Sequence, residues 1–104
     1  MTAEQLAARI MAGDAPVILD VRSRREFDAG HIPGALHVPF WHVAAHVREI
    51  PARLDQLLVV YCGHGPRARF AASTLRRIGF GQVTLLDGHW AGWQHAGLPV
   101  WRTF

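Results

Sequence analysis

Short apolar runs alternate along the chain with segments of helical spacing. Three runs, Val17–Val21, Leu57–Tyr61 and Val83–Leu86, are almost free of polar residues, and a shorter one at Ala35–Val38 is followed by a proline. Such runs are typical of strands that are buried on both faces of a sheet. We therefore predict four strands, and we expect the tail Val100–Phe104 to pair with a sheet edge.

Two capping boxes predict where the first helices begin. Thr2 is followed three residues later by Gln5, and Ser23 is followed at the same spacing by Glu26. At this spacing each side chain of a pair can bond a backbone N–H that the helix leaves free. The first helix should end near Gly13 and the second near residue 29, before a tight connection over residues 30–34.

Proline and glycine also mark the later helical segments. Residues 40–50 have apolar residues at helical spacing and end at Pro51, while Pro66 or Arg67 begins a helix that Gly79 ends. Residues 90–94 should form a turn or a short helix. The apolar residues expected on the inner faces of the helices are Leu6, Ile10 and Met11, then Val43, Val47 and Ile50, and then Phe70, Leu75 and Ile78.

The order of these segments predicts an α/β fold. Strands alternate with helices, and there is no internal repeat, low-complexity linker or break in composition. Crossovers of this kind build a parallel sheet with helices on both faces, and we expect four or five strands. A chain of 104 residues can form one core but not two, so residues 1–104 are predicted to be a single domain.

Composition narrows the compartment and the partners. Half of the residues are hydrophobic, but no run of about 20 apolar residues and no signal-peptide pattern is present, so we expect no membrane span. The formal charge is +3, and all eleven basic residues are arginines that are spread along the chain. This spread argues against nucleic-acid binding and favours a small anionic substrate. The single cysteine, Cys62, cannot form an internal disulfide, which fits a soluble, cytoplasmic protein.

Cys62 lies at the junction between a buried strand and a helix. It directly follows the run Leu57–Tyr61, and the loop from Gly63 to Pro66 leads into the helix. The first turn of a helix carries unpaired N–H groups and the positive end of the helix dipole, which favour a thiolate. Glycine lets successive N–H groups turn towards one anion. The alternative, a merely structural buried cysteine, would not need two glycines and an arginine around the thiol.

Three motifs together resemble the rhodanese-like sulfurtransferases. The first is Cys62-x-x-Gly65-x-Arg67 after a hydrophobic strand. The second is Leu19-Asp20-Val21-Arg22 with Glu26-Phe27 and Gly30-His31-Ile32-Pro33-Gly34-Ala35, and the third runs from Asp87-Gly88 through Trp93 to Gly97-Leu98-Pro99-Val100. The motifs occur in the family's order and span nearly the whole chain. Members commonly have a short edge strand before the first helix, whereas only Met1 precedes Thr2 here, so four and five strands both stay open.

The resemblance implies a rhodanese-like fold in which Cys62 is catalytic and carries the transferred sulfur as a persulfide. It implies that the substrate binds in the loop, at Gly63, His64, Gly65, Pro66, Arg67 and Ala68. A guanidinium five residues after the thiol can hold an oxyanion, whereas Arg69 is expected at the surface. No metal and no organic cofactor are implied.

Three further residues are candidates for a supporting role. Asp20 and Arg22 stand at the carboxyl end of a predicted strand, where ligands bind in parallel sheets. We favour an ion pair that anchors the loop over a direct contact with substrate, because structural pairs outnumber catalytic ones. Trp90 is expected to border the pocket.

The histidines do not suggest a metal site. His42 and His46 stand one helical turn apart, and His37 precedes them, but no carboxylate or thiolate cluster accompanies them. His31 should fix the backbone of the tight connection. The role of His64, inside the Cys62 loop, stays open.

These residues favour a sulfurtransferase. The Cys62 thiolate would attack the outer sulfur of a small anionic donor such as thiosulfate, and cyanide, a thiol or a partner protein would then accept the sulfur. Two alternatives stay open: a non-catalytic module that carries a persulfide for regulation, and a cysteine phosphatase or arsenate reductase. Phosphatase loops of the related kind have one residue more between cysteine and arginine. We expect a monomer or a homodimer.

Overall fold

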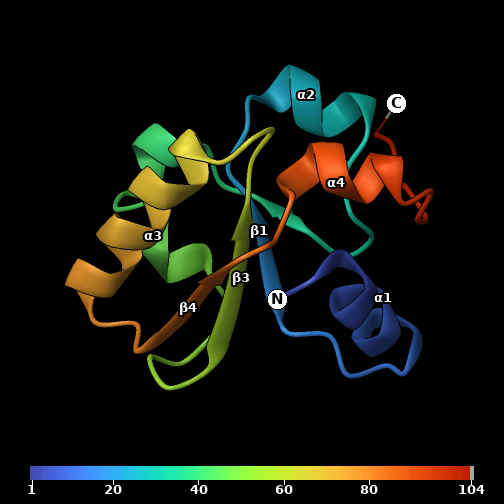
Figure 1. Ribbon diagram of the computed structural model, residues 1–104. Helices are drawn as coiled ribbons and strands as arrows, with labels where there is room; N and C mark the ends of the chain where they lie inside the picture. Colours follow the sequence, from blue (N-terminus) through green and yellow to red (C-terminus); the bar gives the residue numbers. More distant parts are fainter. Residues whose placement is uncertain (104) are drawn as a thin grey trace.

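The centre of the fold is a parallel sheet. In the computed structural model, which describes residues 1–103, the strands follow the order β2-β1-β3-β4 and every neighbouring pair is parallel (Figure 1). The strands are β1 (Val17–Asp20), β2 (Leu36–His37), β3 (Leu57–Tyr61) and β4 (Gln82–Leu85). Each lies within one residue of its predicted bounds. The predicted α/β fold is confirmed, and the sheet formed by the described residues has four strands.

Helices cover both faces of this sheet, as predicted. They are α1 (Ala3–Met11), α2 (Arg24–Ala29), α3 (Pro66–Ile78) and α4 (His89–His95), with two 3-10 turns, η1 (Phe40–His42) and η2 (Val47–Glu49). In Figure 1, α3 lies on one side of the strands, and α1 and α4 lie on the other. The sheet is therefore buried between two layers, which explains why its strands are apolar on both faces.

The central strand β3 contributes side chains to both layers. Tyr61 packs in one core with Leu6 of α1 and Trp93 of α4, whereas the next residue, Cys62, packs in the other core with Leu75 of α3. Successive side chains along a strand point to opposite faces. The alternation therefore turns the thiol towards α3.

Both predicted capping boxes are present. The Thr2 side chain accepts a hydrogen bond from the N–H of Gln5, the Ser23 side chain accepts one from the N–H of Glu26, and each partner side chain bonds back to the cap. α2 ends at the predicted residue, and α1 ends two residues before its predicted limit. Interactions over three residues depend on local sequence alone, which makes these starts predictable.

The inner face of α3 differs from the prediction. Leu75 is fully buried as expected, but Phe70 and Ile78 are 54% and 38% exposed, so their predicted inward positions are wrong. The other buried residues of α3 are Ala68, Ala71 and Ala72. Alanine gives a weak hydrophobic signal, and Phe70 lies one position away from this stripe, on a different side of the helix. On α1, Met11 is likewise exposed, contrary to the prediction.

The segment from residue 40 to residue 50 is not one helix, contrary to the prediction. It forms η1 and η2 with a turn between them. Its hydrogen bonds include tight contacts between residues three apart, such as the 2.9 Å bond from the N–H of Glu49 to the carbonyl of His46. Val43 and Ile50 are nevertheless buried, and Val47 packs against the same core. The apolar spacing therefore identified the inward side but not the type of helix.

Met1 pairs with the end of β4. Its amino group donates to the carbonyl of Leu85 at 3.3 Å, and its own carbonyl accepts from the N–H of Asp87 at 2.8 Å. Within residues 1–103 no strand precedes α1, and this single residue provides the pairing at that edge of the sheet.

The tail does not pair with a sheet edge, so this expectation is wrong for the described residues. Trp101 instead pairs antiparallel with His31, in the connection between α2 and β2. The N–H of Thr103 also donates to the carbonyl of Asp28. Phe104, the last residue of the predicted segment, lies outside the described residues.

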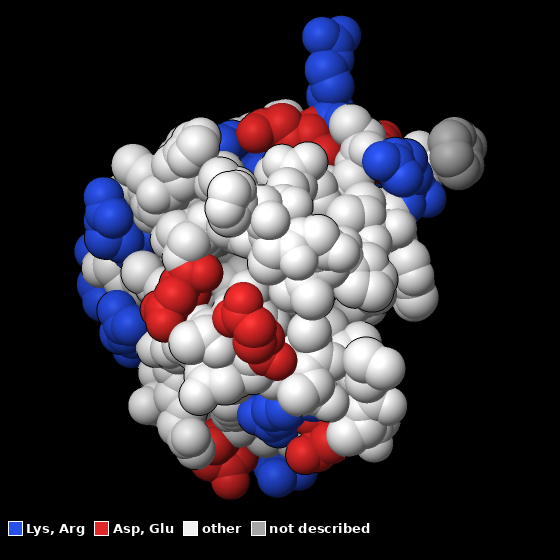
Figure 2. Space-filling view, turned by 45° about the vertical axis from the view of Figure 1, so that its right-hand side comes forward, with Lys and Arg blue, Asp and Glu red and all other residues white. Residues whose placement is uncertain are grey.

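Charged residues form separate small groups on the face that Figure 2 shows. Acidic groups lie near the centre of this face and also beside basic groups at its top and bottom, while the other basic groups lie at its left and right margins. The longest helix, α3, has 13 residues, and no helix among residues 1–103 combines the length and the apolarity needed to cross a bilayer.

The buried face of α3 leads to a stability prediction. Leu75→Ala should lower the free energy of unfolding by about 2–5 kcal/mol because it leaves a cavity in the core. Phe70→Ala should cost less than about 1 kcal/mol, because that ring is mostly exposed and contacts mainly Phe40 edge-on. Urea unfolding of both variants measures the difference, and equal losses would contradict the assignment of the buried face.

Candidate active site

Cys62 lies at the carboxyl edge of the sheet, directly after β3 and three residues before the glycine that caps α3. The carboxyl edge is where parallel sheets bind ligands. The side chain of Cys62 is fully buried. The loop from Cys62 to Gly65 therefore encloses the thiol between the sheet and the first turn of α3.

The first turn of α4 holds the carbonyl groups of this loop. The N–H of Trp90 donates to the carbonyl of Cys62 at 2.9 Å, and the N–H of Ala91 donates to the carbonyl of Gly63 at 3.3 Å. In a planar trans peptide the N–H points opposite to the carbonyl. The N–H groups of Gly63 and His64 are therefore turned away from α4.

Gly65 completes the loop and contacts the sulfur. Its N–H donates a hydrogen bond to Sγ of Cys62 at 3.0 Å. Its φ of +130° is a conformation that only glycine adopts readily. A Cβ at this position would also lie 2.9 Å from Nη1 of Arg69 and 3.3 Å from Nε2 of His89. The position thus requires glycine, and its N–H stabilises negative charge on the sulfur.

Arg67 is held by a carboxylate of α2. Its Nη1 and Nη2 donate to Oε1 and Oε2 of Glu26 at 2.6 and 3.1 Å. Glu26 Oε1 also accepts from the N–H and the hydroxyl of Ser23. The hydrogen bond from Arg67, with those from Ser23, lowers the pKa of Glu26 to about 2 against the opposing effect of burial. The same pair raises the pKa of Arg67.

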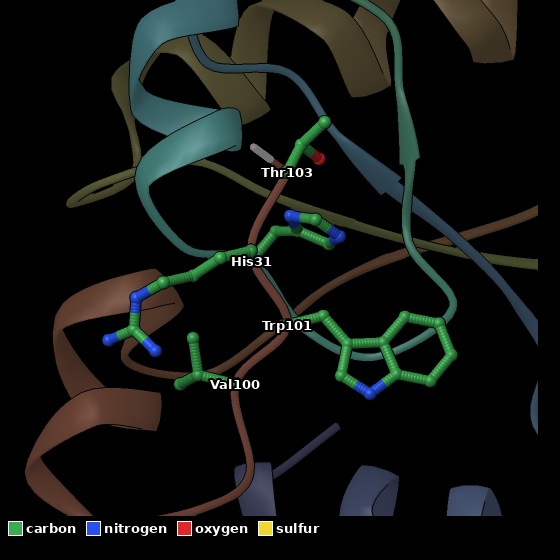
Figure 3. Close-up of a pocket in the computed structure, with 5 residues that line it drawn as sticks. His31, Val100, Trp101 and Thr103 are labelled. Atoms are coloured by element: carbon green, nitrogen blue, oxygen red, sulfur yellow. The ribbon is translucent and has the colours of Figure 1, made fainter.

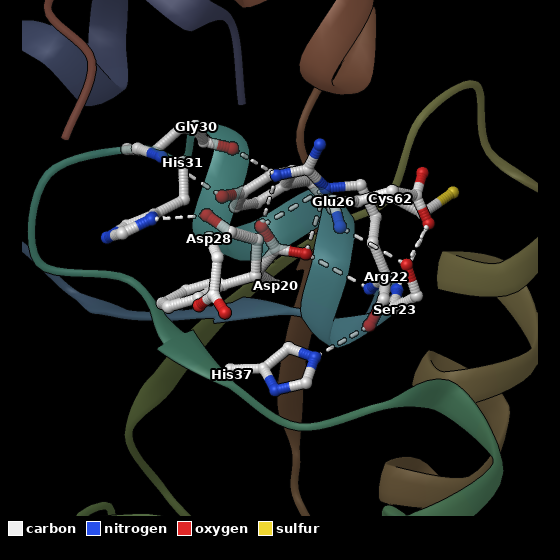
Figure 4. A network of polar contacts seen from close by, with 12 residues as sticks. Asp20, Arg22, Ser23, Glu26, Asp28, Gly30, His31, His37 and Cys62 are labelled. Carbon is white, nitrogen blue, oxygen red and sulfur yellow. Dashed lines mark hydrogen bonds and ion pairs between the residues drawn. The ribbon is translucent and has the colours of Figure 1, made fainter. Parts of the chain in front are cut away.

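The predicted ion pair between Asp20 and Arg22 is present and buried. Arg22 Nη2 lies 2.7 Å from Oδ2 of Asp20 and donates to the carbonyl of Gly30 at 2.6 Å (Figure 4). The guanidinium carbon also lies 4.6 Å from the ring centroid of Trp90 and 5.7 Å from that of Tyr61. Burial opposes the charge, but the hydrogen bond and charge of Asp20 raise the pKa of Arg22. Arg22 therefore ties β1, the connection after α2 and α4 together beside the loop.

His89 is a residue of the site that the sequence did not reveal. It is buried, it has a positive φ of 52°, and its Nδ1 accepts a hydrogen bond from the N–H of Cys62 at 3.3 Å. Burial, together with the charge of Arg69, lowers the pKa of His89, although Asp87 opposes this. An Nδ1 that accepts a hydrogen bond belongs to an imidazole with its proton on Nε2. A histidine at the carboxyl edge of the sheet was the available signal, but no motif marked it.

The other predicted loop residues surround the thiol without contacting it through side-chain hydrogen bonds. His64 is exposed, Pro66 is the first residue of α3, and Ala68 is buried in its first turn. Arg69 is exposed as expected. The structure thus brings the residues from Cys62 to Ala68 together at one site, with Glu26 and His89 added from distant parts of the chain.

The remaining histidines lie away from the thiol. Nδ1 of His31 bonds the carbonyl of Phe27 at 2.8 Å, which is the backbone-fixing role expected for it. Nε2 of His37 bonds the carbonyl of Arg22, and Nδ1 of His46 pairs with a carboxylate. Among residues 1–103 no group of three or more His, Cys, Asp or Glu is placed to hold a metal ion.

Trp90 borders a pocket whose lining does not include Cys62. This pocket, of about 300 Å³, lies between α2 and α4, and its lining is Arg22, Glu26, Ala29, Gly30, Trp90 and Gln94. A second pocket, of about 430 Å³, lies under the tail and is lined by His31, Val100, Trp101, Arg102 and Thr103 (Figure 3). The first includes Arg22 and Glu26, and Glu26 holds Arg67 of the Cys62 loop.

A family model and named relatives match this chain over most of its length. The model of the rhodanese-like domain matches residues 2–96. The thiosulfate sulfurtransferase GlpE of Pseudomonas syringae is 35% identical over 96 residues, which are 92% of this chain and 81% of that protein. The HTH-type transcriptional regulator Rv0324 of Mycobacterium tuberculosis is also 35% identical, over 96% of this chain and 43% of its own length.

A solved structure has the same fold. The crystal structure of the Alr3790 protein from Anabaena sp. superposes with a TM-score of 0.90 at 28% identity, covering 100% of this chain and 93% of the other.

The low pKa of Glu26 leads to a prediction for stability against pH. A carboxyl whose pKa falls from 4.5 to about 2 on folding stabilises the folded state above pH 4.5, and this contribution is lost as the pH falls towards 2. The difference in unfolding free energy between the wild type and Glu26→Gln should therefore shrink over this interval. Urea unfolding at several pH values measures it, with Asp55→Asn, in an exposed ion pair, as the control. A difference that does not change with pH would contradict the pairing.

The contact of His89 with the backbone of Cys62 leads to a second prediction. His89→Leu leaves the buried N–H of Cys62 without an acceptor and should destabilise the fold by about 1–3 kcal/mol. His89→Asn should preserve most of the stability, because asparagine tolerates a positive φ and supplies an oxygen acceptor. Hydrogen exchange of the Cys62 amide, followed by NMR, should be faster in the leucine variant than in the asparagine variant. Equal protection in both would show that His89 is not the acceptor.

Proposed function

The chain belongs to the rhodanese-like domain family, and on that premise we propose that it transfers a sulfane sulfur through a persulfide on Cys62. The donor is a small anion such as thiosulfate, and the acceptor is a thiol, a partner protein or, in an assay, cyanide. The observation that carries the proposal is the hydrogen bond from the Gly65 N–H to Sγ, at the amino end of α3. This contact and the helix dipole both favour a sulfur anion at Cys62.

The first step charges the enzyme with sulfur. The Cys62 thiolate forms a bond to the outer sulfur of thiosulfate while the S–S bond of the donor breaks, and the electron pair of that bond leaves with sulfite. Arg67 would orient the anionic end of the donor, and the loop N–H groups would stabilise the persulfide anion. In the second step the acceptor attacks the outer sulfur and returns the thiolate. No oxidant or reductant is needed, because every electron pair moves between donor, sulfur and acceptor.

A regulatory module is the second candidate. Its support is the similarity to a transcriptional regulator, of whose length this chain covers 43%. In that role Cys62 would accept sulfur and hold it for a partner protein, with slow release to small acceptors. Turnover with a small acceptor separates this role from that of an enzyme.

Mass spectrometry of the intact protein tests the central proposal. Incubation with thiosulfate should add the mass of one sulfur atom to the wild type and nothing to Cys62→Ser. Cyanide should then remove the added mass and form thiocyanate. A gain that survives the serine substitution would refute Cys62 as the carrier, while a stable gain that cyanide does not remove would favour the regulatory role.

The length of the loop leads to a prediction that separates sulfur from phosphorus chemistry. Only four residues stand between Cys62 and Arg67, and Gly65 N–H already contacts Sγ, so the ring fits one sulfur atom better than a phosphoryl group. The wild type should transfer sulfur and hydrolyse no aryl phosphate. Insertion of one glycine between Gly65 and Pro66 should suppress sulfur transfer. Robust phosphatase turnover by the wild type would refute this argument.

A further inference from the structure

Glu26 pairs with Arg67, the residue that is expected to bind the anionic end of the donor. Resting on the proposed sulfur transfer, we propose that Glu26 determines which donors the Cys62 site accepts. It competes with the anionic end of the donor for Arg67, and it thereby disfavours dianionic donors relative to monoanionic ones. The residue would be a specificity determinant of the first step and would take no part in bond making.

The guanidinium expected to bind the donor is already occupied. Both terminal nitrogens of Arg67 donate to the two oxygens of Glu26, across 41 residues of sequence. Glu26 is itself fixed, since its Oε1 accepts from both the N–H and the hydroxyl of Ser23 at the start of α2. A donor must therefore displace a carboxylate held by four hydrogen bonds, or bind beside it.

The ion pair of Glu26 and Arg67 lies beside the loop that encloses the thiol. A Cβ placed on Gly63, the residue after Cys62, would lie 3.2 Å from Nη2 of Arg67. The guanidinium thus lies against the loop that encloses the buried thiol. Glu26 also lines the pocket between α2 and α4 that Arg22 and Trp90 border. A donor that approaches from this pocket meets the carboxylate of Glu26 next to Arg67.

Two further arginines, Arg22 and Arg69, lie near the site. Arg22 is neutralised by the buried carboxylate of Asp20 at 2.7 Å. Arg69 lies on the other side of Gly65, close to His89, and is exposed. With Arg67 also paired, the pocket between α2 and α4 carries little net positive charge. Arg69 has no ion-pair partner within residues 1–103, but it does not line this pocket. A second negative charge on a donor in this pocket is therefore opposed by Glu26.

Donor charge can be varied without changing the chemistry of the transfer. Thiosulfate is a dianion, and an organic thiosulfonate is a monoanion with the same terminal sulfur. In both cases the Cys62 thiolate bonds to the terminal sulfur and the S–S bond breaks, and the electron pair leaves with sulfite or with the organic sulfinate. The ratio of kcat/KM for the two donors, compared between variants, therefore isolates the effect of charge at the site.

The experiment measures kcat/KM for thiosulfate and for benzenethiosulfonate, with cyanide as acceptor, in the wild type and in Glu26→Gln. Glutamine preserves the capping box and removes the charge. We expect the ratio of thiosulfate to thiosulfonate efficiency to rise roughly three- to tenfold, mainly through a lower KM for thiosulfate, the range for one screened charge near a partly exposed site. An unchanged or lower ratio would overturn the proposal.

Two further variants keep the test informative. Asp28→Asn removes the same charge from the same helix, where it pairs with Arg24, and should leave the ratio unchanged. A shift as large as that of Glu26→Gln would reduce the effect to overall charge and overturn the specific role. Arg67→Gln removes the group for which donor and Glu26 compete, and should lower thiosulfate efficiency more than thiosulfonate efficiency; an equal loss would also overturn the proposal. Failure of both donors to load sulfur onto Cys62 in every variant would instead refute the proposed function.

Discussion

The arrangement of the site depends on hydrogen bonds between the Cys62 loop and the start of α4. Two carbonyls of the loop accept from N–H groups of Trp90 and Ala91. Because the peptide unit is rigid, fixing the carbonyls on one side fixes the following N–H groups on the other. Glycine at position 65 then closes the loop in a conformation with positive φ and directs its own N–H at Sγ. The anion-binding character of the loop is thus set by backbone orientation more than by charged side chains.

The charged side chains around this loop are arranged in pairs. Asp20 pairs with Arg22 just after the end of β1, and Glu26 of α2 pairs with Arg67 of α3; each pair buries or half-buries a guanidinium. The first pair lies in the interior, where removing one partner would leave an uncompensated charge, and it holds Arg22 against the carbonyl of Gly30 and the ring of Trp90. The second pair is partly exposed and can exchange partners at modest cost. One ion pair is therefore structural, and the other is suited to respond to an anion.

Local rules predicted much of this fold from the sequence, and long-range contacts account for what they missed. The capping boxes at Thr2 and Ser23, the apolar strands and the strand–loop–helix around Cys62 follow from residues within a few positions of one another. The buried face of α3 was missed because alanines carry little hydrophobic signal. The contacts of Glu26 with Arg67 and of His89 with Cys62 span 41 and 27 residues, and only the folded topology brings them together.

The alanine stripe of α3 has a consequence for how the protein tolerates change. Ala68, Ala71 and Ala72 are fully buried, and the first two pack in the same core as Val60 of β3, so only a methyl group extends from the helix towards the sheet there. The spacing between helix and sheet also sets how far the amino end of α3 lies from the sulfur. A larger residue at Ala71 or Ala72, outside the Cys62 loop, would therefore move the helix away from the sheet and weaken the field of its amino end at the Cys62 sulfur.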